Sequence, residues 1–251
     1  MSVKEHLPQL EPVVNPDATF HCTKQANTSA AVVSLRVGHG NVIHRWKQGS
    51  ILTAYVNACS FPSEHHLLKA IEALKLGMEA WNTLNLGVSF KIVEDINFAV
   101  FQLVYKYDTA RGEGKTYAMS FLPGFSSKNR TLVVFSKVFE TQNIDFIANI
   151  FYHELGHILG LRHERAHELV DERRISSVQF GPANPKSVMN NDFDDGRLHL
   201  IEIHSLDKLW VQKFYAYDEP SFAGSLIVDV EAEYLEVARY NLTSNRKSLV
   251  N

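Results

Sequence analysis

Residues His153–His163 read "HELGHILGLRH", and this stretch decides how the rest of the chain is interpreted. It places three histidines, one glutamate and two glycines within eleven residues. The longer segment "NIDFIANIFYHELGHILG" has apolar residues around almost the whole circumference of a helix, so we expect a buried helix with Asn143 as its cap and Gly160 at its end. Ionisable side chains on a buried helix are costly unless they have partners.

A metal ion is the partner that this spacing favours. His153 and His157 are four residues apart and project from one face of the helix, one turn above the other. Gly160 can adopt the left-handed conformation that ends a helix and reverses the chain, which brings His163 back as a third ligand. Glu154 lies to the side, where it can hold a water without binding the ion. Three neutral imidazoles with one open position are typical of a catalytic zinc site, whereas a structural zinc has four protein ligands.

The alternative is that these histidines are hydrogen-bonded core residues. HExxH alone recurs by accident, but the five fixed positions found here are expected in only about one in ten thousand chains of this length. A second HExxH, "HERAH" at 163–167, lies in the charged run "RHERAHELVDERR", which is typical of a solvated surface. We therefore expect the first frame to bind the metal, and Glu164 to be a structural carboxylate rather than a general base.

Composition limits the class of protein. The chain has 251 residues, a formal net charge of -3 and 21% charged residues. A nucleic-acid-binding protein would carry a basic surplus, and no stretch approaches the roughly 18 apolar residues of a membrane span, so we expect neither partner. The N-terminus has no secretory signal, which predicts a cytoplasmic protein if Met1 is the native start and a secreted one if a signal was removed.

The pattern divides the chain into three parts. Residues 1–44 form a polar N-terminal arm in the position of a pro-segment, residues 45–217 a well-patterned domain, and residues 218–251 a C-terminal extension. The domain begins with a predicted strand at 51–56. An amphipathic helix follows, from a cap at Ser63 to an end at Gly87. Its apolar stripe consists of Leu67, Leu68, Ile71, Leu74, Met78 and Trp81.

Strands dominate the middle of the domain and a helix closes it. Four β-rich runs follow the first helix: 88–93, 99–107, 116–122 and 131–135. After the buried helix, the closing helix begins with a cap at Ser205 and has a stripe of Leu206, Leu209, Trp210 and Phe214. This order predicts an α/β fold of the α+β type, with one mixed, twisted sheet, an active-site helix, a backing helix and a C-terminal helix.

The central stretch resembles the HExxHxxGxxH signature of the metzincin zinc endopeptidases. Its matching residues are His153, Glu154, His157, Gly160 and His163. "HELGHILGL" is most similar to the matrixin branch, whereas Glu164 directly after the third histidine is similar to the astacin branch. "PKSVMNND" supplies Met189 where those enzymes carry a methionine beneath the metal. The resemblance covers about residues 46–217 and implies a zincin-type domain.

The resemblance also implies a function. It implies hydrolysis of internal peptide bonds by a monomer with one catalytic Zn²⁺, bound by the three histidines, with Glu154 as general base and then general acid. The partner would be a protein or peptide substrate. "AMSFLPG" resembles the edge strand on which family members lay that substrate, so backbone pairing is expected along Ala118, Met119 and Ser120.

Several alternatives remain open at the level of sequence. Astacins have a tyrosine two residues after the turn methionine, but here Asn191 stands in that position and receives no catalytic role. Cys22 could block the zinc as a latency switch, although its neighbours do not match the known motif, so a free thiol or a bridge to Cys59 is favoured. A zinc-bound interaction module is a second class, against which the intact Glu154 argues. A hydrolase of small or unusual substrates is a third.

Overall fold

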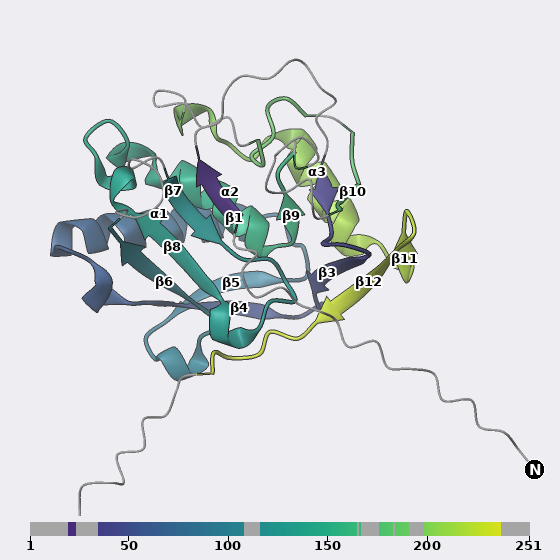
Figure 1. The fold of residues 1–251 in the computed structure, drawn as a ribbon, viewed down its shortest axis with the longest axis horizontal. Helices are drawn as coiled ribbons and strands as arrows, with labels where there is room; N and C mark the ends of the chain where they lie inside the picture. The colour runs from purple at the N-terminus through teal and green to yellow at the C-terminus, as the bar shows by residue number, and fades with distance from the viewer. Residues whose placement is uncertain are drawn as a thin grey trace, which may run out of the picture.

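The computed structural model of this chain describes residues 20–23, 35–107, 116–164, 166, 176–182, 184–190 and 198–236, the first of these ranges by its backbone alone. Three α-helices lie in these ranges: α1 (Glu64–Asn82), α2 (Ile147–Ile158) and α3 (Ser205–Ala216). Connections contain short 3-10 helices at Ala58–Ser60, Ile96–Phe98, Ser127–Asn129, Ser136–Phe139, Ile144–Phe146 and Leu198–Leu200. Helices α1 and α2 pack together beside the largest sheet, and α3 lies toward the other end of the molecule (Figure 1).

The main sheet has the strand order β1-β7-β8-β6-β4-β5. Its strands are β1 (Phe20–Thr23), β4 (Ile51–Val56), β5 (Ser89–Val93), β6 (Phe101–Lys106), β7 (Thr116–Ser120) and β8 (Thr131–Phe135). The four strands β5, β4, β6 and β8 are parallel, whereas β7 is antiparallel to β8 and β1 is antiparallel to β7. The prediction of a mixed sheet with few helices is therefore confirmed.

Two smaller sheets join distant parts of the chain. β2 (Arg36–Val37) lies between β9 (Leu161–Arg162) and β10 (Val178–Gln179). β3 (Val42–Trp46) pairs in parallel with β12 (Ser225–Val230), which pairs with β11 (Ser221–Phe222).

These pairings bear on the predicted division of the chain. Leu35, Val37 and Ile43 are buried in the core, and the predicted boundary after residue 44 falls within β3. The segment predicted as a C-terminal extension from residue 218 begins with two strands that join β3 in one sheet. The sequence pattern missed both features because these short strands are completed by partners far away in the chain.

Helix α1 begins where the sequence predicts but ends earlier. Ser63 is its N-cap, and the Ser63 hydroxyl accepts a hydrogen bond from the backbone N–H of His66 (3.3 Å). The helix ends at Asn82, and Gly87 lies five residues later in the turn before β5 with a φ of 79°. Glycine suits that left-handed conformation, so Gly87 belongs to the turn and not to the helix end.

The buried face of α1 differs in part from the predicted stripe. Leu68 is 57% exposed. Leu74, Met78 and Trp81 of the stripe are buried as predicted, and the small residues Ala70, Ala73 and Gly77 are buried with them. Small residues on this face allow close packing against α2, because a Cβ atom on Gly77 would lie 3.0 Å from Leu155 Cδ1. The buried face of α1 is therefore the one whose small residues let α1 and α2 pack closely, and not the one with the most large apolar side chains.

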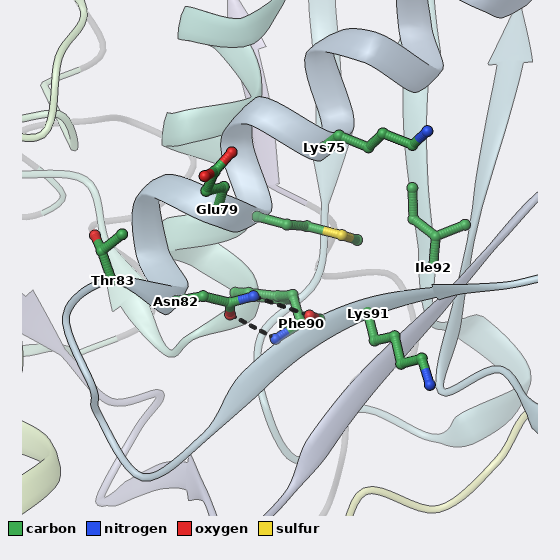
Figure 2. Close-up of a pocket in the computed structure, with 8 residues that line it drawn as sticks. Lys75, Glu79, Asn82, Thr83, Phe90, Lys91 and Ile92 are labelled. Atoms are coloured by element: carbon green, nitrogen blue, oxygen red, sulfur yellow. Dashed lines mark hydrogen bonds between the residues drawn. The ribbon is translucent and has the colours of Figure 1, made fainter.

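The last residue of α1 covers the free edge of β5. Asn82 Nδ2 donates to the carbonyl oxygen of Phe90 (3.0 Å), and the N–H of Phe90 donates to Asn82 Oδ1 (2.8 Å). Figure 2 shows this pair beside a groove of about 510 Å³ lined by Lys75, Met78, Glu79, Asn82, Thr83, Phe90, Lys91 and Ile92. The side-chain amide thus pairs with the backbone N–H and carbonyl group of Phe90, as a neighbouring strand would, and fewer backbone groups on this edge of the sheet stay unpaired.

Helix α2 is buried as predicted, but its start differs. A 3-10 turn at Ile144–Phe146 precedes it, and Asn143 does not cap it, since its side chain donates to the carbonyl oxygen of Lys137 (2.9 Å). The last carbonyl groups of α2 have no helical partners, and two core side chains satisfy them. Trp46 Nε1 donates to Ile158 O (2.6 Å), and the Tyr215 hydroxyl donates to Leu159 O (2.9 Å).

Helix α3 begins one residue earlier than predicted, and its buried face agrees only in part with the predicted stripe. Its N-cap is His204 rather than Ser205, and Leu206 and Leu209 are 39% and 44% exposed. Phe214 of the predicted stripe is buried and Trp210 is partly buried against the core, but Asp207, Val211 and Tyr215 are buried as well. The prediction assigned the face from apolar residues, whereas Asp207 turns inward because buried donors surround it.

Among the described residues, no helix has both the length and the hydropathy that crossing a bilayer requires.

Candidate metal centre

Helix α2 and the turn after it position the predicted ligands. His153, Glu154 and His157 lie on α2 and are each 0% exposed. Gly160 has a φ of 98°, in the left-handed region, and the chain reverses there as predicted. Strand β9 follows and carries the chain to His163, which is 1% exposed. One helix and one reversal therefore bring the three histidines together.

The three imidazoles converge on one point. His163 Nε2 lies 3.1 Å from Nε2 of His157 and 3.1 Å from Nε2 of His153. Neighbouring nitrogens of a tetrahedral zinc site, with bonds of about 2.0 Å, lie roughly 3.3 Å apart. Within the described part of the chain, these residues form the one cluster of three or more side chains with metal-ligand spacing.

The remaining ring nitrogens show why a cation fits this point. His153 Nδ1 donates to Val188 O (2.7 Å) and His157 Nδ1 donates to Leu161 O (2.8 Å), so each neutral ring presents a lone pair on Nε2. Burial, and next the proximity of His163, hold the pKa of His153 well below its ordinary value, which keeps that ring neutral. Lone pairs directed at one another repel unless a cation lies between them, so this donor set suits a zinc ion.

Met189 lies directly against α2. Its side chain is 0% exposed, and a Cβ atom added to Gly156 would lie 2.5 Å from Met189 Sδ and 3.3 Å from Trp81 Cζ2. Gly156 stands in the helix directly before His157. The methionine therefore occupies the space that the missing side chain leaves beneath the metal-site helix.

We expect Gly156→Ala to lower the free energy of unfolding by roughly 1 to 3 kcal/mol, because an added methyl group overfills a packed core. Urea denaturation of the metal-free protein measures this effect. Adding Met189→Ala to Gly156→Ala should cost less than the two separate changes together, because each relieves the other. A Gly156→Ala variant as stable as the parent would show that Met189 can move aside freely.

The turn that carries Met189 is held by polar residues that the sequence did not reveal. Asp207 on α3 accepts hydrogen bonds from the side chain of Asn184 and from the backbone N–H of Val188, both at 3.0 Å. The N–H of Met189 donates to Ser187 Oγ (3.1 Å). Asn184 and Asp207 are 23 residues apart and belong to no shared motif, so spacing gave no signal for them.

Glu164 is also buried beside this turn, at 0% exposure, although the surrounding charged run suggested a surface. Its backbone N–H donates to the carbonyl oxygen of Met189 (3.1 Å). Burial raises the pKa of the Glu164 carboxyl to about 8. This position agrees with a structural carboxylate rather than with a solvated side chain.

The predicted substrate strand does not form the edge of the sheet. Residues Ala118, Met119 and Ser120 lie on β7, which pairs with β8 on one side and with β1 on the other. The register places Phe20 opposite Ser120 and His21 opposite Met119. The prediction treated residues 1–44 as an N-terminal arm, whereas three of them, Phe20, His21 and Thr23, have partners along this strand.

The other predicted positions fall in different places. Asn191 and His167 lie outside the described residues. Cys59 is exposed and free, so the alternative of a bridge to Cys22 is wrong. Cys22 lies on β1, next to the strand expected to bind substrate.

The comparisons with known proteins differ in how much of the chain they match. No curated protein matches the chain. Fifty-five chains of solved structures match it, among them the crystal structure of myroilysin, with 15% identity and a TM-score of 0.31 over 50% of this chain and 52% of that chain. This chain thus spans about half the length of the myroilysin chain.

A family model covers more of the sequence. Residues 38–177, more than half of the chain, match the model described as dual-action HEIGH metallo-peptidase. The letters HEIGH agree with residues 153–157 except at Leu155, which stands in place of isoleucine. Proteins of this family use zinc, and the three-histidine cluster can bind one such ion. A match of this length across the metal-site helix shows that the chain belongs to the dual-action HEIGH metallo-peptidase family.

Proposed function

We propose that this protein hydrolyses internal peptide bonds, with one zinc ion bound by His153, His157 and His163. The observation that carries the proposal is the convergence of three buried Nε2 atoms at separations of 3.1 Å, with two of the rings held as Nδ1–H tautomers. A closed structural site would need a fourth protein ligand, and the cluster among the described residues has three.

Glu154 is the residue that we propose moves the proton. Zinc, when bound, supplies Lewis-acid chemistry that polarises a carbonyl group and acidifies water. Glu154 lies next to His153 on α2 and is fully buried. Its oxygen accepts the proton of the attacking water and then delivers it to the nitrogen of the departing amine. A purely structural zinc site would have no use for this carboxylate.

We further propose that the domain is of the metzincin type. The positive φ at Gly160 supports this, because it allows the third histidine to return to the ion, and so does Met189 beneath α2. The mixture of matrixin-like and astacin-like features remains a proposal from the sequence. Cleavage of a fluorescently labelled casein, with detection of new internal N-termini, tests endopeptidase activity directly.

Substrate access is the first consequence to test. The three histidines and Glu154 are at most 1% exposed, and β1 pairs along β7. We propose that an extended substrate pairs with β7 in place of β1, as strands add to a sheet edge. The N-terminal arm would then compete with substrate for the same backbone groups.

Deletion of residues 1–34 is therefore expected to raise kcat/KM, mainly through a lower KM. A fall of roughly tenfold corresponds to a pairing free energy of about 1.4 kcal/mol. The deletion retains Leu35 and Val37, which are part of the core. Steady-state cleavage of a series of peptides measures the change. An unaltered KM would mean that β1 does not compete with substrate.

Thiol reagents provide the matched control for this deletion. Because the proposed competition acts through backbone pairing, modification of Cys22 is not expected to activate the enzyme. Cys22→Ser should likewise behave as the parent. Activation by a thiol reagent that disappears in Cys22→Ser would instead support a cysteine bound at the zinc.

A further inference from the structure

Val188 connects the metal site to α3 through both of its backbone polar groups. Its carbonyl oxygen accepts the hydrogen bond from His153 Nδ1 (2.7 Å), and its N–H donates to Asp207 Oδ2 (3.0 Å). Both hydrogen bonds are buried, and Val188 is 0% exposed. A single residue of an irregular turn thus lies between a carboxylate on α3 and an imidazole on α2.

Asp207 holds this turn at two points. Its Oδ1 accepts from Asn184 Nδ2, and its Oδ2 accepts from the N–H groups of Val188 and His204, each at 3.0 Å. Asp207 is 2% exposed, and a carboxylate removed from water needs such donors. It also occupies the third position of α3, where the helix dipole favours negative charge. The helix therefore holds the carboxylate in place, and the turn is bound to it.

We propose that Asp207 is a positioning residue for the metal site, which fixes the imidazole of His153 through the Val188 backbone. This inference rests on the proposed role of His153 as a zinc ligand. The Val188 carbonyl group keeps the proton of the ring on Nδ1 and sets the ring rotation, so the Nε2 lone pair points toward the other two ligands. Displacement of Val188 would turn that lone pair away from the ion.

Capping of α3 is the simpler role for Asp207. Its side chain accepts from the backbone N–H of His204, while the His204 side chain accepts from the backbone of Asp207, which completes a capping box. Such a role would stabilise the metal-free and the metal-loaded protein equally. His204→Ala removes the histidine half of the box and keeps the bond between Asp207 and Val188, so it is a matched control.

The experiment compares the zinc dissociation constants of the parent, Asp207→Asn and His204→Ala by competition with a chelator. An amide at position 207 has one acceptor oxygen where the carboxylate has two, so its NH2 group faces either the side chain of Asn184 or the N–H groups of Val188 and His204. We expect the zinc Kd of Asp207→Asn to rise about 10- to 100-fold, as for other partners that orient a ligating histidine. His204→Ala should lower the unfolding temperature without a change in zinc affinity.

A second readout needs no metal. The Nδ1–H proton of His153 should give a protected NMR signal in the metal-free parent and in His204→Ala, because Val188 O binds it. In Asp207→Asn this signal should exchange faster with water. A role limited to capping would leave the signal unaltered.

The possible results distinguish a positioning role of Asp207 from a role limited to capping α3. If Asp207→Asn lowers stability but binds zinc as tightly as the parent, the positioning role is overturned. If that variant does not fold, Asn184→Ala replaces it, because it removes one donor to Asp207 and leaves the cap in place. Asn184→Ala should raise the zinc Kd by a smaller factor, and an unaltered Kd would overturn the proposal equally. Failure of the proposed function looks different, since the parent itself would then bind no zinc through its three histidines.

Discussion

Glu154→Gln is expected to remove most peptide-bond hydrolysis while the zinc ion stays bound. The amide retains the shape of the side chain but cannot accept the proton of the attacking water. General acid–base catalysis of this kind contributes about 100- to 10,000-fold in rate, so kcat should fall by a factor in that range. Zinc content, measured by atomic emission, should equal that of the parent because the three imidazoles remain.

The control for this variant is Glu164→Gln. Glu164 is buried beside the Met189 turn, and we expect it to act in structure rather than in proton transfer. Glu164→Gln should therefore retain far more activity than Glu154→Gln. Equal cleavage by the parent and Glu154→Gln would refute the proposed mechanism. Zinc-loaded proteins that all fail to cleave would favour an interaction module.

His163→Ala is expected to lose both the zinc ion and the activity. It removes the Nε2 atom that lies 3.1 Å from each of the other two, which leaves two protein ligands for the ion. Two imidazoles hold zinc far more weakly than three, so dialysis should leave the variant nearly metal-free. Inductively coupled plasma measurements and casein cleavage on the same samples give both results.

His167→Ala tests the competing frame at residues 163–167. We expect this variant to keep its zinc and its activity, because the chain reverses at Gly160 and brings His163 to the ion. Similar losses in both variants would mean that the ligands come from the second frame. This comparison is informative because the two histidines are only four residues apart.

The convergence of the three histidines could be predicted from the sequence because its geometry is local. Helix periodicity alone places His153 above His157, and a glycine at 160 permits the reversal that returns His163. Strands such as β4 and β8 also follow from local patterns of β-branched residues. No distant partner is needed for any of these features.

The missed features depend on partners far away in the chain. Asp207 turns inward because Asn184 and Val188 provide donors, so counting apolar residues on α3 missed this buried carboxylate. Arg45 on β3 donates to Asp229 on β12 and to the carbonyl oxygens of Phe214 and Tyr217, which ties the C-terminal strands to the domain. A one-dimensional pattern contains neither pairing.

The pairing of β1 along β7 is a further contact of this kind. The edge-strand prediction for β7 came from the family resemblance of "AMSFLPG", and only the register of Phe20 opposite Ser120 reveals that another segment lies there. This contact changes the expected behaviour of the protein, since the proposed substrate strand is already paired.

A zinc titration of the metal-free protein tests the central claim most directly. Zinc is added in steps to the full chain and to the form without residues 1–34, and cleavage of labelled casein is measured at each step. The account predicts that cleavage rises with bound zinc, levels off at one ion per chain, and yields new internal N-termini in the substrate. Binding of one zinc ion by the three histidines without any cleavage in either form would contradict it.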